Sequence, residues 1–162
     1  MDKFPTKRIV KIGIVVKDIE KTVKEYADLF GIPVPQVRPA RPAGPPLTEP
    51  EVPGGKVPGT VFHGKKGMDR IKTAVIPLEP IYIELAQPVD DFGPWHEFLQ
   101  KHGQGPFWMA TEASGGFSDV EEMMARKGMP IFHKAEKGTQ RYGYFETWEQ
   151  LGIALEFKEI DQ

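Results

Sequence analysis

The segment Ile81-Tyr82-Ile83-Glu84-Leu85 decides the fold, because its pattern returns 72 positions later as Ile153-Ala154-Leu155-Glu156-Phe157. In each copy apolar residues occupy alternate positions and a glutamate takes the fourth place. Strict alternation over five residues is typical of a half-buried strand. Glu84 and Glu156 therefore face away from the apolar side of the sheet, and each marks a candidate site.

A second pair of segments repeats at a different offset. Gly31-Ile32-Pro33-Val34 matches Gly128-Met129-Pro130-Ile131, 97 positions later. Matching segments in the same order indicate internal duplication. The offsets differ by 97 − 72 = 25 residues, so the first half carries an insertion, which we place at the proline- and glycine-rich residues 35–58. A segment of this length and composition is either a functional lid or an irregular excursion.

The repeat predicts two tandem βαβββ modules, at residues 1–88 (including the insertion) and 107–162, joined within residues 89–106 by a short linker helix that ends at Gly103. One helix covers only one face of each module's sheet. The expected fold class is therefore α+β, with a curved mixed sheet, helices behind it and a concave cavity in front.

Local signals set the expected elements of the first module. Asp18 is a helix N-cap and Gly31 ends that helix, with apolar residues from Ile19 to Phe30 at helical spacing facing inward. Ile32-Pro33-Val34 is expected to begin the next strand. Further strands are predicted at 61–63 and 70–76 before the first glutamate strand.

Composition excludes several classes of protein. The 162 residues are 27% charged and 40% hydrophobic, which is typical of a globular chain, and the formal net charge of −2 gives no reason to expect nucleic acid or a membrane as partner. The sequence has no cysteine, which removes disulfides and thiolate chemistry. No signal-peptide pattern or membrane-length apolar run is present, so we expect a cytoplasmic protein.

Five segments together carry a family resemblance: residues 11–21, 83–88, 98–105, 141–145 and 151–156. The chain resembles the vicinal oxygen chelate superfamily, which includes glyoxalase I, extradiol dioxygenases and bleomycin-resistance proteins, and most closely its methylmalonyl-CoA epimerase-like branch. The resemblance covers nearly the whole chain outside the insertion. It implies the fold described above and a homodimer.

The sequence departs from this branch at its metal ligands. Where the branch has a metal-binding histidine in the first strand, this chain has Lys11, and where it has His-His, this chain has Phe107-Trp108. The two remaining ligand positions are retained as Glu84 and Glu156. Two carboxylates without imidazole would bind a transition metal poorly, so we expect no metal and no cofactor.

The residues left at these positions suggest proton transfer. Glu84 or Glu156 would take a proton from a carbon next to a carbonyl, and Lys11 would stabilise the enolate in place of a metal. Alternatively, Lys11 and the glutamates form a structural salt bridge. Trp108 would give the cavity an aromatic wall, and Tyr82 shares the face of Glu84.

Three further residues are candidates for substrate binding. His63 and His133 are predicted on strands at related points of the two halves, where each could face the cavity or be an ordinary surface or core histidine. Tyr144 shares a face with Tyr142 and could donate a hydrogen bond to an oxyanion, although packing explains it equally well.

Three functions remain open on this evidence. The first is a metal-independent racemase or epimerase acting on a small molecule, an acyl-CoA or a flat aromatic ketone such as a dihydroisoflavone. The second is a binding protein that sequesters a small molecule without turnover, in the manner of bleomycin-resistance proteins. The third is a metal-dependent lyase similar to glyoxalase I, against which the missing histidines argue.

Overall fold

The computed structural model describes residues 2–43, 59–137 and 140–160. Four helices are found in these ranges: α1 (Ile19–Phe30), α2 (Pro94–His102), α3 (Phe117–Arg126) and α4 (Trp148–Leu151). The strands there are β1 (Ile9–Val15), β2 (Gly59–Phe62), β3 (Lys65–Gly67), β4 (Ile71–Ile76), β5 (Tyr82–Pro88), β6 (Gly105–Ser114), β7 (Ile131–Lys137), β8 (Gln140–Phe145) and β9 (Ala154–Ile160). None of the described helices is both long enough and apolar enough to cross a membrane.

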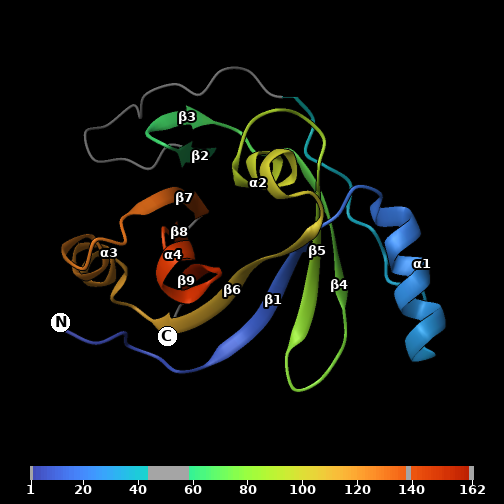
Figure 1. Ribbon diagram of the computed structural model, residues 1–162, viewed down its shortest axis with the longest axis horizontal. Coiled ribbons are helices and arrows are strands. Elements are labelled where there is room, and N and C mark those ends of the chain that lie inside the picture. Colours follow the sequence, from blue (N-terminus) through green and yellow to red (C-terminus); the bar gives the residue numbers. More distant parts are fainter. Residues whose placement is uncertain (1, 44–58, 138–139, 161–162) are drawn as a thin grey trace.

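The strands of the described ranges form one strongly curled mixed sheet in the order β3-β2-β7-β8-β9-β6-β1-β5-β4. β1 pairs with β5 and β6 pairs with β9 in parallel, whereas the other pairs are antiparallel. β1 and β6 lie side by side at the centre and join the two halves of the chain. Figure 1 shows the resulting half-barrel, with α1 and α3 on opposite outer sides and α2 at the open side. The predicted fold class is confirmed.

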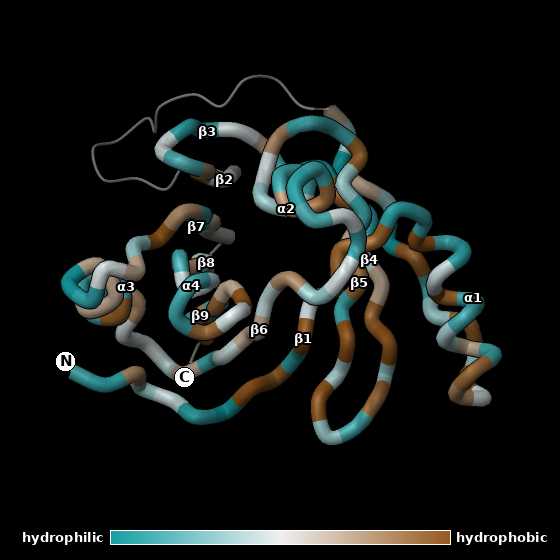
Figure 2. The backbone as a smooth tube through the Cα atoms, viewed as in Figure 1, coloured by the Kyte–Doolittle hydropathy of each residue, from teal (hydrophilic) through white to brown (hydrophobic). Residues whose placement is uncertain are grey.

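The outer face of the sheet is covered as the alternating pattern predicted. Ile19 and Val23 of α1 pack against a cluster that includes Leu85, and α3 packs against Leu155 and Phe157. In Figure 2, β1 is largely hydrophobic, whereas β3 at the end of the sheet is hydrophilic to neutral. The apolar side of each glutamate strand therefore faces a helix, and the glutamates face the concave side.

The limits of α1 follow from its two caps. The Asp18 carboxylate accepts a hydrogen bond from the Lys21 backbone N–H at 3.0 Å, and Gly31 ends the helix in the left-handed conformation at φ 64°. The prediction that Phe30 faces inward is wrong, because its side chain at the last position of the helix is 51% exposed. The Phe30 ring stacks on Tyr26 of the preceding turn, with the ring centres 6.0 Å apart.

The strand predicted at 32–34 is also wrong. This segment is irregular, and within residues 32–43 sheet pairing is limited to a bridge between Arg38 and Thr73 of β4. Pro33 and Pro35 have no backbone N–H to donate to a sheet ladder, which explains why pairing is delayed until Arg38. The insertion placed at 35–58 falls outside the described residues from 44 onward.

The β2–β3 hairpin joins a different part of the sheet from the rest of the first half. β2 pairs with β7, so the hairpin lies against the strands of the second half, while β4 and β5 lie at the opposite end. His63, predicted on a strand, instead lies in the turn of this hairpin at φ 48°. The division of the chain into modules at 1–88 and 107–162 stays a prediction.

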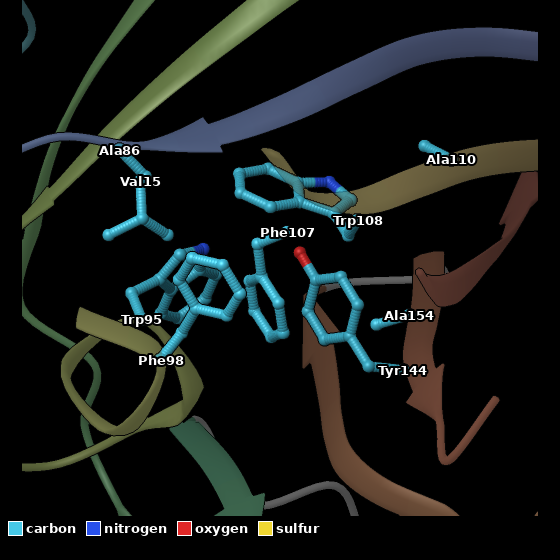
Figure 3. Close-up of a cluster of buried hydrophobic side chains, with 9 residues drawn as sticks. All are labelled: Val15, Ala86, Trp95, Phe98, Phe107, Trp108, Ala110, Tyr144 and Ala154. Carbon is cyan, nitrogen blue, oxygen red and sulfur yellow. The ribbon is translucent and has the colours of Figure 1, made fainter. Parts of the chain in front are cut away.

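The linker helix α2 packs on the concave side of the sheet, and its predicted end at Gly103 is confirmed. Its residues Trp95 and Phe98 are buried in a cluster with Phe107, Trp108 and Tyr144. Figure 3 shows these rings converging from α2, β6 and β8. One end of the concave face is thereby filled with aromatic side chains.

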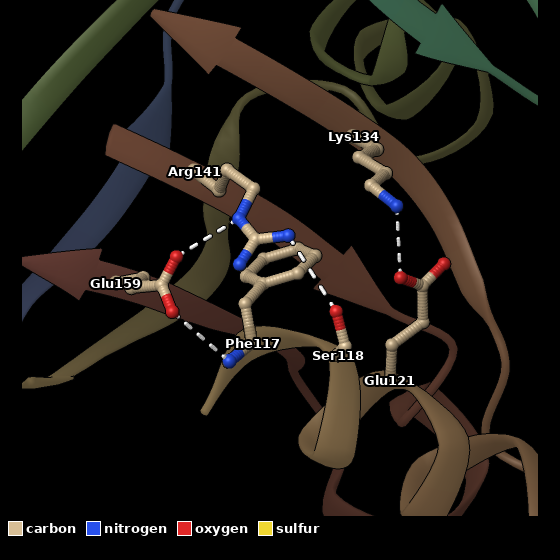
Figure 4. A network of polar contacts seen from close by, with 6 residues as sticks. All are labelled: Phe117, Ser118, Glu121, Lys134, Arg141 and Glu159. Atoms are coloured by element: carbon tan, nitrogen blue, oxygen red, sulfur yellow. Dashed lines mark hydrogen bonds and ion pairs between the residues drawn. The ribbon is translucent and has the colours of Figure 1, made fainter. Parts of the chain in front are cut away.

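The start of α3 is fastened to the sheet by a charged contact. Its N-cap, Gly116, has no side chain to cap the helix, and the Glu159 carboxylate accepts the Phe117 N–H instead, at 3.3 Å. The other oxygen of Glu159 accepts a hydrogen bond from Arg141 Nε at 2.8 Å. The Arg141 guanidinium lies 5.2 Å from the centre of the Phe117 ring, as Figure 4 shows. This network fixes β8, which carries two of the tyrosines on the concave face, to β9 and α3.

Candidate functional site

Five of the candidate site residues lie in a single row across the concave face. Register neighbours on successive strands place them side by side, from β7 through β8, β9, β6 and β1 to β5. The row runs His133, Tyr144, Glu156, Ala110, Lys11 and Tyr82. Five of these six had been selected from the sequence, and the sixth, Ala110, is a buried alanine between Glu156 and Lys11.

Lys11 lies between the two glutamates. Its Nζ is 2.5 Å from Glu84 Oε2 and 3.9 Å from Glu156 Oε2. The side chains of Lys11 and Glu84 are 16% and 21% exposed, whereas that of Glu156 is 4% exposed. The cluster therefore has one end that solvent reaches and one end that is closed.

The two glutamates differ in their hydrogen bonding. Glu84 Oε2 accepts the short hydrogen bond from the Lys11 ammonium. Glu156 Oε2 is buried and has no hydrogen-bond partner among the described residues. A buried oxygen without a hydrogen bond is costly in a folded protein, and a catalytic role is one recognised reason for retaining it.

Charge and burial act in opposite directions at this cluster. Burial alone would lower the pKa of Lys11, but the negative charges of Glu156 and Glu84 outweigh it and hold the pKa above its ordinary value of 10.5. For Glu156, burial raises the pKa above the ordinary 4.5, helped by the charge of Glu84 and opposed by that of Lys11. Lys11 is thus a permanent cation at neutral pH, and Glu156 is a more basic carboxylate than usual.

Trp108 forms an aromatic wall next to this cluster, and it is 1% exposed. The indole lies directly over Gly13, where an added Cβ would come within 2.0 Å of the ring. Only glycine therefore permits the indole to lie flat on β1. The indole nitrogen of Trp108 is buried without a hydrogen-bond partner among the described residues.

The tyrosines of the row are hydrogen-bond donors at every physiological pH. Burial raises the pKa of Tyr144 well above its ordinary value, and the nearby negative charge of Glu156 raises it further. Burial also raises the pKa of Tyr82, which lies at the more open end. Figure 3 shows the Tyr144 hydroxyl pointing toward Trp108.

The two histidines that the sequence singled out have different environments. His133 is fully buried, and its Nε2 lies 2.7 Å from Asp69 Oδ2. His63 is 46% exposed by its side chain and lies 3.3 Å from Glu97, so the structure does not bring it to the row. Asp69 was missed, because it stands in a connection between two strands where nothing in the local sequence marks it.

Metal-ligand geometry is not found at these positions. Among residues 2–43, 59–137 and 140–160, no three His, Asp or Glu side chains are grouped so that they could hold a metal ion. The Lys11 ammonium instead lies against the carboxylates that would have to provide ligands.

A separate pocket of about 190 Å³ opens between α2 and α4. Phe98, His102 and Trp148 line it, with the His102 and Trp148 rings stacked at 5.2 Å, and Phe107 and Ala154 form its inner wall. Because Phe107 and Ala154 also belong to the aromatic cluster of the concave face, the pocket adjoins that cluster.

Comparison with known proteins supports the fold. The sequence matches no protein family and no curated protein. Solved structures that it resembles include a hypothetical protein from Bacillus halodurans, with a TM-score of 0.61, 16% identity, and 96% of this chain and 95% of that chain covered. Methylmalonyl-CoA epimerase from Mycobacterium tuberculosis matches with a TM-score of 0.58 and 19% identity over 95% of this chain and 88% of that one.

A methylmalonyl-CoA epimerase in complex with methylmalonyl-CoA and NH4+ also matches, with a TM-score of 0.58, 19% identity, and 94% and 93% of the two chains covered. At these identities the likeness establishes the fold alone. The chain has the vicinal oxygen chelate fold found in methylmalonyl-CoA epimerases.

Proposed function

We propose that the protein is a metal-independent racemase or epimerase that moves a proton at a carbon next to a carbonyl. The proposal rests on the different contacts that Lys11 makes with the two glutamates. Glu84 is held at 2.5 Å by the ammonium, while the buried Glu156 Oε2 lies 3.9 Å from it and has no hydrogen-bond partner among the described residues. This arrangement provides a base and a cation in one cluster.

Glu156 is the base in this proposal. Its pKa is raised by burial, so its carboxylate takes a proton more readily than an exposed glutamate does. The electrons of the broken C–H bond move into the carbonyl and form an enolate. Lys11 then stabilises the enolate oxygen, with the protonated Tyr144 or Tyr82 as a further hydrogen-bond donor.

The metal of the fold family does not fit this set of residues. A divalent cation between Glu84 and Glu156 would meet the ammonium of Lys11, whose pKa is held above the ordinary lysine value. Imidazole ligands are absent from the cluster, and carboxylates alone hold transition metals weakly. In this proposal Lys11 does the electrostatic work of the metal, and no step requires a metal ion.

The substrate class is an acyl-CoA or a flat aromatic ketone such as a dihydroisoflavone. Solved methylmalonyl-CoA epimerases of the same fold support the first, and the aromatic wall formed by Trp108 supports the second. We further propose that the protein acts as a homodimer, as the resemblance implies.

Solvent-deuterium exchange tests the proposal. The wild type, E156Q and E84Q are each incubated in D2O with methylmalonyl-CoA or with a dihydroisoflavone, and interconversion of the two stereoisomers is followed. We expect E156Q to lower interconversion by about 100-fold or more, the size of a lost general base. E84Q should lower it less, since Lys11 retains Glu156 as a partner.

Two results would argue against a metal-independent racemase or epimerase. Binding of either compound without deuterium exchange or interconversion would favour a sequestering protein of the bleomycin-resistance type. Stoichiometric nickel, cobalt or zinc in protein purified without chelator, lost in an E84Q/E156Q double variant, would favour a metal-dependent lyase.

A further inference from the structure

We propose that His133, positioned by Asp69, is the second proton-transfer group of the site. The inference rests on the proposed function and extends it. Inversion at carbon needs a proton to leave one face and another to arrive at the opposite face. Glu156 provides the proton-transfer group on one face. Among the described residues of the concave row, His133 and Tyr144 are the other fully buried titratable side chains, and burial keeps Tyr144 protonated, so we assign the opposite face to His133.

The geometry of the pair is that of an oriented histidine. Asp69 Oδ2 lies 2.7 Å from His133 Nε2, and the two side chains are 7% and 0% exposed. This contact assigns a proton to Nε2 and leaves Nδ1 as the working nitrogen. Nδ1 is buried and has no partner among the described residues, so it is available to a substrate.

His133 stands across the row from Lys11, on the other side of Glu156. It is the register partner of Tyr144, which in turn pairs with Glu156. Two strand spacings separate the backbones of His133 and Glu156 by about 10 Å along the sheet, and the curl of the sheet brings their side chains toward each other. A substrate carbon held beside Tyr144, which stands between them in the row, would have Glu156 on one side and His133 on the other.

The surrounding rings restrict the imidazole to this orientation. It packs against Tyr144 at 5.1 Å and against Trp95 of α2 at 5.3 Å between ring centres. Asp69 is itself confined, because a Cβ on Gly93 would lie 2.4 Å from its Oδ1. A purely structural contact at this point could be made by an apolar side chain, without burying polar atoms that lack partners.

The proton transfers of the proposed epimerisation balance. In one direction Glu156 removes the proton from carbon, and the doubly protonated His133 delivers its Nδ1 proton to the opposite face of the enolate. Glu156 ends protonated and His133 ends neutral with its Nε2–H donated to Asp69. Exchange with water restores both groups, and in the reverse direction the free Nδ1 takes the proton while Glu156 returns one. No redox partner is needed.

The test measures each stereoisomer separately in D2O, for the wild type, H133Q and D69N. In H133Q we expect one stereoisomer to exchange its proton through Glu156 and to keep its configuration, while the other exchanges at least 100-fold more slowly. Interconversion should fall by a similar factor. D69N should show the same one-sided pattern in weaker form, since Asp69 acts through the imidazole.

Controls separate this pattern from damage to the fold. H96N replaces a histidine of α2 outside the row and should exchange both stereoisomers at wild-type rates. Equal loss at both stereoisomers in H133Q and in D69N, or no loss at either, would overturn the role of His133 and leave the base function of Glu156 standing. A wild type that exchanges neither stereoisomer would overturn both proposals.

Discussion

At the residue scale, the charged cluster of the concave face depends on Lys11, whose ammonium lies between two carboxylates. Lys11 contacts Glu84 across 73 positions of sequence and lies within ion-pair distance of Glu156. Both carboxylates interact with this single cation, but they differ in their exposure to solvent, so the loss of Lys11 should affect them differently. Glu84 faces solvent in part, whereas Glu156 does not.

The pH dependence of exchange should report this difference. The pKa of Glu156 is raised by burial, so the wild-type rate of proton abstraction should begin to fall at a pH above the ordinary glutamate value of 4.5 as the solution becomes more acidic. In K11M the loss of a nearby positive charge raises that pKa further, and the acid limb of kcat/KM should move to still higher pH. An acid limb that stays in place in K11M would contradict the assignment of Glu156 as base.

The contact between Gly13 and Trp108 gives a second test at this scale. A methyl group at position 13 would overlap the buried indole, so we expect G13A to lower the free energy of unfolding by about 1–3 kcal/mol. Gly105 is the matched control, because an added Cβ there meets nothing within 4 Å. Urea unfolding of G13A and G105A should therefore separate them, and equal stabilities would show that the indole is not confined.

At the scale of elements, α2 determines how much of the concave face is filled. It is a linker in the sequence, yet Trp95 and Phe98 form part of the same buried cluster as the strands of both halves. Glycines at both ends, Gly93 and Gly103, have positive φ angles and let the chain turn sharply into and out of the helix. α2 therefore functions as a packed element of the core.

Truncation of two tryptophans tests this view of α2. Trp95 is 4% exposed, and its replacement by alanine should cost about 3–5 kcal/mol in the free energy of unfolding. Trp148 of α4 is 39% exposed and lies at the rim of the neighbouring pocket, so W148A should cost clearly less. If chemical denaturation gives the reverse order, α2 does not pack on the sheet as described.

At the scale of the whole molecule, the charged cluster bridges strands from the two halves. Lys11 and Glu84 belong to β1 and β5, and Glu156 belongs to β9, on the far side of β6. The interactions of Lys11 therefore stabilise the closure of the curled sheet as well as the site.

Replacement of Lys11 by methionine should destabilise the fold at neutral pH. It leaves two carboxylates facing each other without a cation. We expect the free energy of unfolding to fall by roughly 2–4 kcal/mol, which is less than for a fully buried pair because Lys11 and Glu84 are partly exposed. The exposed pair of Lys72 with Glu20 provides a control, and K72M should change the stability little. Thermal unfolding of both variants at pH 7 makes the comparison.

The contribution of Lys11 to stability should also depend on pH in alkaline solution. The folded pKa of Lys11 lies above 10.5, so its contribution is fully present below pH 10.5 and is lost as the pH rises through the folded value. The wild type should therefore lose more stability than K11M between pH 10.5 and higher pH. Parallel loss in the two proteins would mean that the ammonium contributes nothing to the folded state.

Much of this architecture could be predicted from the sequence. Period-two alternation gave the glutamate strands, the residues Asp18 and Gly31 gave the ends of α1, and Gly103 gave the end of α2. These features depend on neighbours in the chain or on which side of a strand is apolar. The strand predicted at residues 32–34 is wrong because the prediction rested on the sequence repeat. A repeat does not show whether a segment that contains proline can form the hydrogen bonds of a sheet.

The sequence alone thus determined the two glutamate strands and the limits of α1, and that two glutamates face the concave side. Only the tertiary structure decided that Lys11 donates a hydrogen bond to Glu84, that the described residues give Glu156 Oε2 an ion pair but no hydrogen bond, and that His133 contacts Asp69. It also decided that the β2–β3 hairpin pairs with β7. The reason is physical: local pattern follows from backbone geometry and hydrophobicity, whereas these contacts arise when a curled sheet brings together side chains from distant parts of the chain.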